Sequence, residues 1–322
     1  DAYRAASRDL PGRSFMTAIE HHADWWRRAV VYQIYIRSFA DGNGDGTGDI
    51  AGIRSRLPYL ADLGIDAIWV NPWYASPLRD GGYDVADYRA IDPCYGTLAE
   101  AESLIAKARD LGIRILVDLV PNHTSSEHAW FLEALASPPG SAARRRYHFT
   151  AGRGPDGSEP PSDWRSVFGG PAWTRVPDGE WYLHLFDSSQ PDLNWDHPEV
   201  RAEFEDIIRF WLDRGAAGMR VDVAHALAKD ATYPDVGEEG QREDHTLDID
   251  HPFWDRDGLQ DIIRSWRRIL DEYGDRMMVA EAWIRPERRP VYLRPDAYHQ
   301  AFEFELLRAE WDAAEFLSLI HI

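Results

Sequence analysis

Two carboxylates at the ends of two predicted strands are the residues best placed to do chemistry. Asp222 closes the apolar run in GMRVDVAH, and Glu281 follows the apolar run in MMVAEAW. An acidic side chain directly after a buried strand is costly unless it has a function. In an α/β barrel, the loops at the carboxyl ends of the strands build the active site. The two positions therefore predict a catalytic pair of carboxylates.

Arg220 stands two residues before Asp222 on the same predicted strand. Side chains alternate along a strand with a period of two, so both should project to the same side. The permanent positive charge of the arginine would keep Asp222 ionised and oriented. The alternative is an ion pair that only buttresses the strands.

The loop DGNGDGTGD offers oxygen ligands at alternating positions, Asp41, Asn43, Asp45 and Asp49. Hard oxygen donors at this spacing, with glycines that permit a tight wrap, predict a Ca²⁺ loop. It is not a complete EF-hand, because Gly52 stands where a bidentate Glu belongs. We expect a structural ion, with a plain Asp/Gly turn, or Mg²⁺ in place of Ca²⁺, as alternatives.

Apolar runs that alternate with amphipathic stretches must position these residues. Five runs, at 29–36, 66–72, 114–120, 217–224 and 276–283, predict strands buried on both faces. Helical patterns lie between them and end in glycines suited to a left-handed C-cap, at Gly64, Gly112, Gly215 and Gly274. The order predicts an α/β fold with a parallel sheet.

One connection is much longer than the others. The irregular segment 124–197, with GRGPDGSEPPSDW and short aromatic runs, is too long for an ordinary βα loop and predicts a small inserted subdomain over the site. A doubly wound open sheet is the competing architecture. No GxGxxG follows the first strand and no phosphate-binding loop is present, so a barrel is favoured.

Composition narrows the class of protein. The 322 residues, 44% of them hydrophobic, suffice for a large core. The 55 acidic and 35 basic residues give a formal charge of −20, which argues against nucleic acid or anionic lipid as a partner. Fourteen Trp, 14 Tyr and 12 Phe would suit stacking on a neutral sugar, although most must serve the core.

The cysteine count, the absence of long apolar runs and the first residues bear on the cellular compartment of the protein. The single cysteine, Cys94, excludes an intrachain disulfide and has no metal-ligand spacing around it. No run of about 18 apolar residues predicts a membrane span, and the first residues lack a signal-peptide core. We expect a cytoplasmic enzyme without a membrane anchor, although the first residue is not Met and a segment could precede it.

The motifs together resemble glycoside hydrolase family 13, the α-amylase family. DLVPNH (118–123), GMRVD (218–222) and EAW (281–283) stand in the order and strand context of that family, and the resemblance spans residues 25–316. QPDLN (190–194) is similar to the oligo-1,6-glucosidase and α-glucosidase branch. The resemblance implies a TIM (β/α)8-type barrel at 25–123 and 198–322, a B-type subdomain at 124–197, and an N-terminal extension at 1–24.

This resemblance implies a retaining mechanism with defined roles. Asp222 would be the nucleophile that forms a covalent glucosyl-enzyme, and Glu281 the general acid and then the base that activates water. Asp80, Tyr83 and His123 would bind the non-reducing glucose, with Tyr83 stacking on the ring. Phe168, Phe186 and Gln190 are expected to line the pocket, although Phe186 could equally be core. The branch also implies calcium in the 41–49 loop, completed by the Thr47 carbonyl.

The resemblance ends before the barrel would close. Family members carry a third catalytic Asp, preceded by His, after the seventh strand, and no such motif follows Glu281. Residues 301–316 predict the approach to a sixth strand and its helix, and LSLIHI at the end does not continue the pattern. We therefore expect an incomplete barrel of about six strands, and a fragment that is unstable or inactive alone.

Several functions fit these motifs. The first is an α-glucosidase on short α-glucosides with α-1,4 or α-1,6 bonds, where Val223 after the nucleophile favours α-1,6. A transglucosylase or isomerase such as trehalose synthase would use the same residues. A non-catalytic barrel homologue would lose them, and a carbohydrate-binding module would not need them. A monomer or weak homodimer acting on a small oligosaccharide is expected.

Overall fold

The computed structural model describes residues 24–241 and 251–319. Its centre is a curved parallel sheet in the order β1-β2-β5-β9-β10-β11. The strands are β1 (Val31–Ile34), β2 (Ala67–Val70), β5 (Arg114–Leu119), β9 (Gly218–Val221), β10 (Met277–Ala280) and β11 (Gln300–Ala301). The five predicted strands and the weak sixth are thus confirmed, as an incomplete TIM-type barrel.

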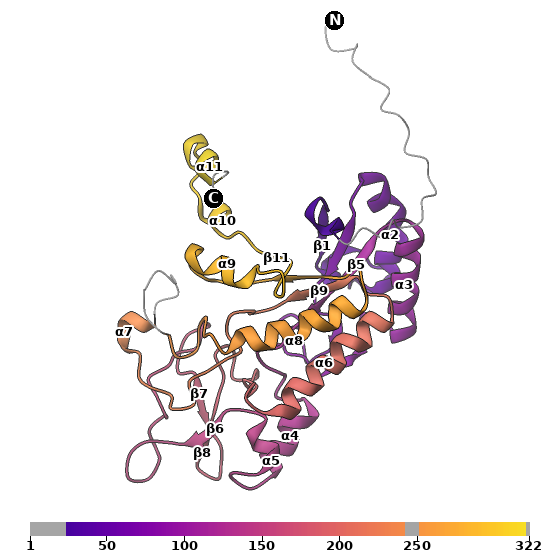
Figure 1. The fold of residues 1–322 in the computed structure, drawn as a ribbon. Coiled ribbons are helices and arrows are strands. Elements are labelled where there is room, and N and C mark those ends of the chain that lie inside the picture. The colour runs from indigo at the N-terminus through magenta and orange to yellow at the C-terminus, as the bar shows by residue number, and fades with distance from the viewer. Residues whose placement is uncertain (1–23, 242–250, 320–322) are drawn as a thin grey trace, which may run out of the picture.

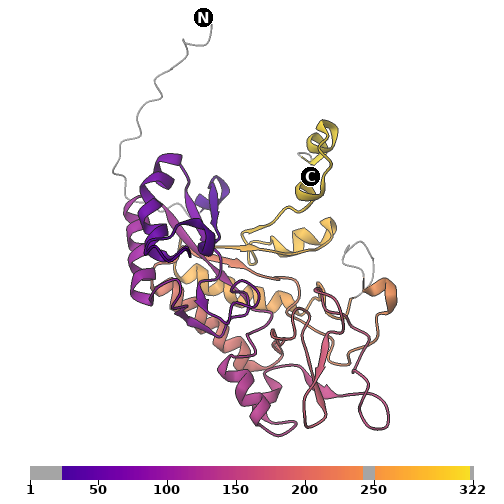
Figure 2. The same cartoon turned by 180° about the vertical axis from the view of Figure 1, so that it is seen from behind.

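Four long helices cover the outer face of this sheet (Figures 1 and 2). They are α2 (Ile50–Leu63), α3 (Leu98–Asp110), α6 (Pro198–Asp213) and α8 (Leu259–Glu272). The glycines predicted to end them have φ angles of +77° to +93°, which a side chain would make costly. Each helix therefore stops where the chain must turn back into the next strand.

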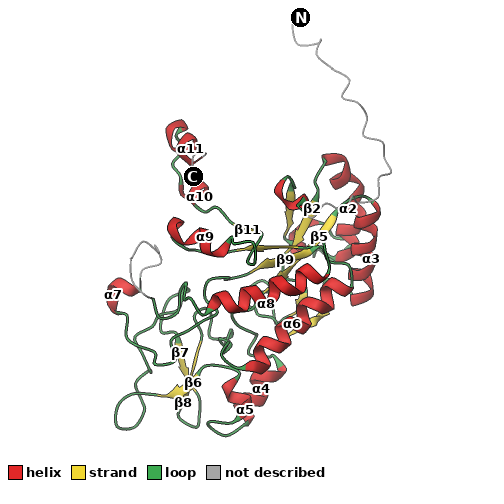
Figure 3. Ribbon diagram, viewed as in Figure 1, coloured by secondary structure: helices red, strands yellow, loops and turns green. Residues whose placement is uncertain are grey.

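Shorter elements complete the outline, as Figure 3 shows. They are η1 (Trp25–Arg27), α1 (Ile36–Phe39), α4 (Ala129–Ala136), α5 (Ala142–Arg145), α7 (Gly237–Gly240), η2 (Pro286–Arg288), α9 (Arg289–Tyr292), α10 (Glu305–Arg308) and α11 (Ala313–Leu319). The sequence did not predict the antiparallel pair β3 (Tyr74–Ala75) and β4 (Asp87–Ile91), which precedes α3.

Between β5 and α6 the chain forms α4, α5 and a separate antiparallel sheet. This sheet has the order β6-β8-β7, with β6 (Phe149–Ala151), β7 (Trp173–Arg175) and β8 (Glu180–Leu183). In Figure 1 it lies below the main sheet, away from α2 and α3. A subdomain inserted after the third barrel strand is therefore present, while its boundaries at 124 and 197 stay predictions. The predicted extension 1–24 lies outside the described residues except for Asp24.

Side chains on both faces of the sheet hold it together. The inner face buries Trp25, Ala67, Leu116, Ala217 and Met277 in one cluster, and the outer face packs on the helices through a much larger one. Gly218 begins β9 at φ +153°, and a Cβ there would lie 1.9 Å from the carbonyl oxygen of Met277. The glycine of GMRVD is thus required for β9 to approach β10.

Candidate active site

Strand register brings the predicted catalytic residues together at the carboxyl edge of the sheet. In the parallel ladders, Arg220 of β9 lies opposite Asp118 of β5 and opposite Val279 of β10. The amide of Asp222 donates to the Leu119 carbonyl at 2.8 Å, and the amide of Glu281 donates to the Val221 carbonyl at 2.9 Å. Main-chain hydrogen bonds therefore place both carboxylates next to one another.

A single guanidinium contacts three carboxylates. Arg220 Nη1 lies 2.5 Å from Asp222 Oδ1 and 3.0 Å from Asp118 Oδ1. Arg220 Nη2 lies 2.9 Å from Glu281 Oε2. The side chains of Asp118 and Asp222 are 0% and 8% exposed, whereas that of Glu281 is 21% exposed. Of the three carboxylates, Glu281 is therefore the one most open to water.

Burial dominates the ionisation of the two aspartates. Burial raises the pKa of Asp222 well above its ordinary value, and Arg220 opposes that shift while Glu281 and Asp118 add to it. Burial likewise raises the pKa of Asp118 to about 6, again against Arg220. Arg220 thus acts on Asp222 in the predicted direction, but it does not outweigh burial and two neighbouring carboxylates.

The sequence analysis gave Asp118 no role, although the structure places it at the centre of this cluster. Its Oδ2 accepts hydrogen bonds from Trp69 Nε1 and from the Tyr83 hydroxyl, both at 3.0 Å. Tyr83 also accepts from Asn71 Nδ2 at 3.0 Å. Asp118 lies one residue before the end of β5 in RILVDLV, so an acidic residue near the carboxyl end of an apolar strand was the signal that could have found it.

The backbone beside the cluster is strained. Val223 follows Asp222 at φ +44°, an unusual conformation for a β-branched residue. Its amide donates to Glu281 Oε2 at 3.1 Å, in addition to the contact between Glu281 and Arg220. The strained turn therefore helps to aim the Glu281 carboxylate. The structure does not test the predicted influence of Val223 on linkage preference.

A second group contains most of the predicted sugar-binding residues. Gln190 Nε2 donates to Asp80 Oδ2 at 2.8 Å and lies 3.1 Å from His123 Nε2. His123 Nε2 also lies 3.1 Å from the carbonyl oxygen of Tyr83, which links this group to the carboxylate cluster. Gln190 and His123 are almost fully buried, while Asp80 and Tyr83 are partly exposed.

The ionisation of this second group also follows burial. Burial raises the pKa of Asp80, while the hydrogen bond from Gln190 opposes the shift. Burial lowers the pKa of His123 to about 4, so its ring is neutral at neutral pH. A neutral imidazole beside an acidic side chain suits a neutral ligand that both donates and accepts hydrogen bonds.

The two phenylalanines predicted to line the pocket lie one behind the other in space, with Phe186 next to His123 and Phe168 next to Phe186. The Phe186 ring lies 5.2 Å from that of His123, and the Phe168 ring lies 5.7 Å from that of Phe186. Phe186 is half-buried, whereas Phe168 is 58% exposed. Phe186 thus reaches the candidate site directly and Phe168 only through it.

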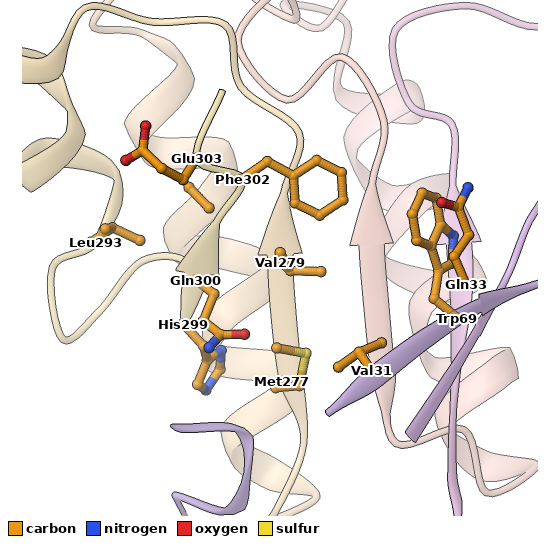
Figure 4. Close-up of a pocket in the computed structure, with 11 residues that line it drawn as sticks. Val31, Gln33, Trp69, Met277, Val279, Leu293, His299, Gln300, Phe302 and Glu303 are labelled. Atoms are coloured by element: carbon orange, nitrogen blue, oxygen red, sulfur yellow. The ribbon is translucent and has the colours of Figure 1, made fainter. Parts of the chain in front are cut away.

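An open cavity of about 530 Å³ adjoins the carboxylate cluster on the inner face of the sheet. Figure 4 shows Val31 and Gln33 of β1, Trp69 of β2, and Met277 and Val279 of β10 around it. Phe302 lies at its rim, and the Arg220 guanidinium is 4.7 Å from the Trp69 ring and 5.7 Å from the Phe302 ring. Apolar side chains of the barrel interior therefore face open space beside the site.

The predicted calcium loop forms a separate structure before α2. Asp41 accepts from the amides of Asn43, Gly44 and Gly46, and these hydrogen bonds lower its pKa. Asp45 accepts from the Thr47 amide at 2.8 Å and from Asn43 Nδ2 at 3.0 Å. Gly44 and Gly46 adopt φ angles of +85° and +93°, as a tight wrap requires.

Asp49 has a defined role of another kind. Its Oδ1 accepts from the amide of Gly52 at 2.6 Å and so caps the N-terminus of α2. Across 24–241 and 251–319, no three His, Cys, Asp or Glu side chains are grouped as metal ligands. The loop oxygens fit calcium by type, since carboxylate, amide and carbonyl oxygens are its ligands. Calcium itself stays a prediction.

Comparison with known proteins settles the family. A family model described as "Alpha amylase, catalytic domain" matches residues 33–318, most of the chain. The chain belongs to the α-amylase family. Within the described residues, no helix has the length and apolar character that crossing a membrane requires.

Three similar proteins illustrate this family relationship. The trehalose-6-phosphate hydrolase of Escherichia coli K12 is 48% identical over 229 residues, 70% of this chain and 40% of that protein. The oligo-1,6-glucosidase of Heyndrickxia coagulans is 48% identical over 221 residues, 68% of this chain and 39% of that protein. The trehalulose synthase from Pseudomonas mesoacidophila MX-45 superposes with a TM-score of 0.84 at 36% identity, covering 92% of this chain and 54% of that one. The chain spans about half or less of the length of the relatives that it matches.

Proposed function

We propose that the chain carries the nucleophile and the acid/base of a retaining α-glucosidase. Such an enzyme releases glucose from the non-reducing end of short α-glucosides with α-1,4 or α-1,6 bonds. The observation that carries this proposal is the Arg220 guanidinium, which contacts Asp222 at 2.5 Å and Glu281 at 2.9 Å. Two carboxylates held by one cation lie within reach of one glycosidic bond, as double displacement requires.

In the first step, an oxygen of Asp222 attacks the anomeric carbon and the bond to the leaving oxygen breaks. Glu281 gives its proton to that oxygen, so the products are a glucosyl ester on Asp222 and a free alcohol. Asp222 must be ionised to attack. Arg220 favours the carboxylate form of Asp222, and the step requires Glu281 to bring the proton that it donates.

In the second step, Glu281 acts as a base. It takes a proton from a water molecule whose oxygen attacks the anomeric carbon, and the ester bond to Asp222 breaks. Two inversions leave the configuration unchanged. The exposure of Glu281, compared with the burial of Asp222 and Asp118, suits a group that exchanges protons with water and with the leaving group.

The second group would hold the terminal glucose. Asp80 would accept from its hydroxyl groups, His123 and Gln190 would supply neutral partners, and Tyr83 would stack on the ring. Phe186 would contact the sugar from the side of the inserted subdomain. The hydrogen bond from Gln190 to Asp80 at 2.8 Å would close one end of the glucose site, which favours a chain end over an internal bond.

Glucosyl transfer is the second candidate, since a solved structure with a TM-score of 0.84 is named a trehalulose synthase. It needs the same residues, with a sugar hydroxyl in place of water in the second step. An enzyme fits this site better than the non-catalytic homologue, because Arg220 contacts both Asp222 and Glu281.

Turnover of p-nitrophenyl α-glucoside, with Asp222→Asn as the control, tests the proposed chemistry. We expect release of p-nitrophenol by the complete protein that contains the chain, and its loss in the variant. Products formed from maltose then separate hydrolysis from transfer. Turnover that survives Asp222→Asn would refute the assignment.

A further inference from the structure

A buried lysine that the proposed mechanism does not use lies behind the glucose pocket. Lys229 Nζ is 2.8 Å from Asp192 Oδ2 and 2.6 Å from Asn122 Oδ1, and all three side chains are buried. The chain has only two lysines, Lys107 and Lys229, among 35 Lys and Arg residues. A compact ammonium is therefore used at a buried position in a chain that otherwise relies on arginine.

Lys229 sets the orientation of the Asn122 amide. An ammonium group has three donors and no acceptor, so Asn122 must turn Oδ1 toward it. Asn122 Nδ2 then lies 3.2 Å from Asp192 Oδ2 and 3.2 Å from His123 Nδ1. An ionised Asp192 can only accept, which requires the same orientation. The amide is thus held at both ends.

The amide in turn selects one tautomer of His123. Because Asn122 presents a donor, His123 Nδ1 must accept, and the ring proton belongs on Nε2. His123 Nε2 lies 3.1 Å from the Tyr83 carbonyl, which can only accept. In the opposite tautomer, with the ring proton on Nδ1, the Nδ1–H group would face the Nδ2–H group of Asn122, and the Tyr83 carbonyl would lose its donor from His123. Only the contact between His123 Nε2 and Gln190 Nε2 would improve, because Nε2 could then accept. Two contacts outweigh one.

We propose that Lys229 and Asp192 are a positioning pair that fixes His123 in the Nε2–H tautomer through Asn122. The Nε2–H group then stays on the Tyr83 carbonyl and holds the His123 ring in one position beside Gln190, which contacts Asp80. A sugar bound there would meet a ring of fixed orientation. This use of the tautomer rests on the proposed function, but the tautomer itself is a property of the fold.

Long-range ¹H–¹⁵N correlation NMR of the whole chain with ¹⁵N-labelled histidine tests the proposal without turnover. The His123 signals are assigned by their loss in His123→Gln. At about pH 7 we expect Nδ1 without a proton and Nε2 with one, because burial keeps the ring neutral. A proton on Nδ1 in the unaltered protein would overturn the proposal.

Because Asp192 alone would still hold Asn122 Nδ2, the double variant Lys229→Met/Asp192→Asn is needed to release the amide, and it should give a mixture of tautomers or the opposite one. Lys107→Met, at the exposed lysine, should change nothing. A folded double variant that keeps the single Nε2–H form would overturn the proposal. If this variant does not fold, Asn122→Asp decides, since an acceptor opposite Nδ1 must move the proton to Nδ1. An unchanged Nε2–H form in that variant would equally refute the proposal.

Measurement of KM and kcat gives a second test, which depends on the proposed function. In the complete enzyme, Lys229→Met/Asp192→Asn should raise KM about 5- to 10-fold with a smaller change in kcat, the effect of a His123 ring that is held less firmly in the proposed glucose site. Lys107→Met should leave both unchanged. Absence of any glucosidase turnover would reject the proposed function, while the NMR result would still decide the tautomer.

Discussion

Arg220 Nη2 lies 2.9 Å from Glu281 Oε2, while Nη1 of the same guanidinium contacts Asp222 and Asp118. One cation therefore neutralises only part of the charge that three neighbouring carboxylates would carry. The arrangement explains why burial outweighs Arg220 in setting the pKa of Asp222.

Removal of the shared cation should destabilise the fold strongly. Arg220→Met leaves buried carboxylates without their counter-ion, so we expect the free energy of unfolding at about pH 7.5 to fall by about 3 to 5 kcal/mol. Arg220→Lys keeps the charge but not the planar fork and should lose less. Urea unfolding measures both, with Arg56→Met at an exposed position as the control. An Arg220→Met loss no larger than that of the control would contradict the ion-pair cluster.

Asp118 should make stability fall as the pH rises. Its pKa is raised by burial from the ordinary 3.8 to about 6, so its contribution is full below the unfolded value and is lost as pH rises through about 6. Asp118→Asn removes this loss. Relative to the unaltered protein, its free energy of unfolding should therefore be more favourable at about pH 7.5 than at about pH 4.5, by about 1 to 3 kcal/mol.

Comparison of the two pH values cancels any pH-independent cost of placing an amide among the donors Trp69, Tyr83 and Arg220. Asp110→Asn, at an exposed position at the end of α3, serves as the control and should show no such change. A difference between Asp118→Asn and the unaltered protein that is independent of pH would show that Asp118 is ionised throughout.

Tyr83 should separate a structural role from a sugar-binding one. Its hydroxyl donates to Asp118 and accepts from Asn71, both at 3.0 Å. Tyr83→Phe removes these bonds but keeps the ring, so it should lower the free energy of unfolding by about 1 to 2 kcal/mol and leave stacking intact. Tyr83→Ala should also raise KM for glucosides in the complete enzyme. Equal KM values for the two variants would exclude stacking.

Calcium should stabilise the fold if the 41–49 loop binds it. Saturating Ca²⁺ after treatment with a chelator should raise the midpoint of thermal unfolding, since a ligand at 100 times its Kd adds about 2.7 kcal/mol. Asp41→Asn and Asp45→Asn should lose this increase, while Asp110→Asn should keep it. A midpoint that does not respond to Ca²⁺ would leave the loop as the Asp/Gly turn given as the alternative.

The parts of the fold that the sequence predicted well share a physical cause. The strands of the main sheet are buried on both faces and read as apolar runs, and the left-handed glycines mark where each helix must end. The pair β3 and β4 escaped prediction because β3 has only two residues and β4 is not a continuous apolar run like the strands of the main sheet. β11 comprises only Gln300–Ala301, so its pattern was correspondingly weak.

The candidate site was predictable where a residue follows its strand directly. Asp222 and Glu281 obey that rule, whereas Asp118 lies inside β5, one residue before its end, and was left without a role. Asn122, Asp192 and Lys229 could not be grouped in advance, because they come from three segments that are distant in sequence and meet only in the fold. Gln190 was predicted by family resemblance, while its bond to Asp80 depends on the fold.

The central claim is that Asp222 forms a covalent bond to glucose with Glu281 as its acid and base. The most direct test is mass spectrometry of Glu281→Gln in the complete enzyme after reaction with α-glucosyl fluoride, whose leaving group needs no acid. We predict a glucosyl adduct that maps to the peptide containing Asp222 and is absent from a protein that also carries Asp222→Asn. An adduct on any other residue, or one that persists with Asp222→Asn, would contradict the claim.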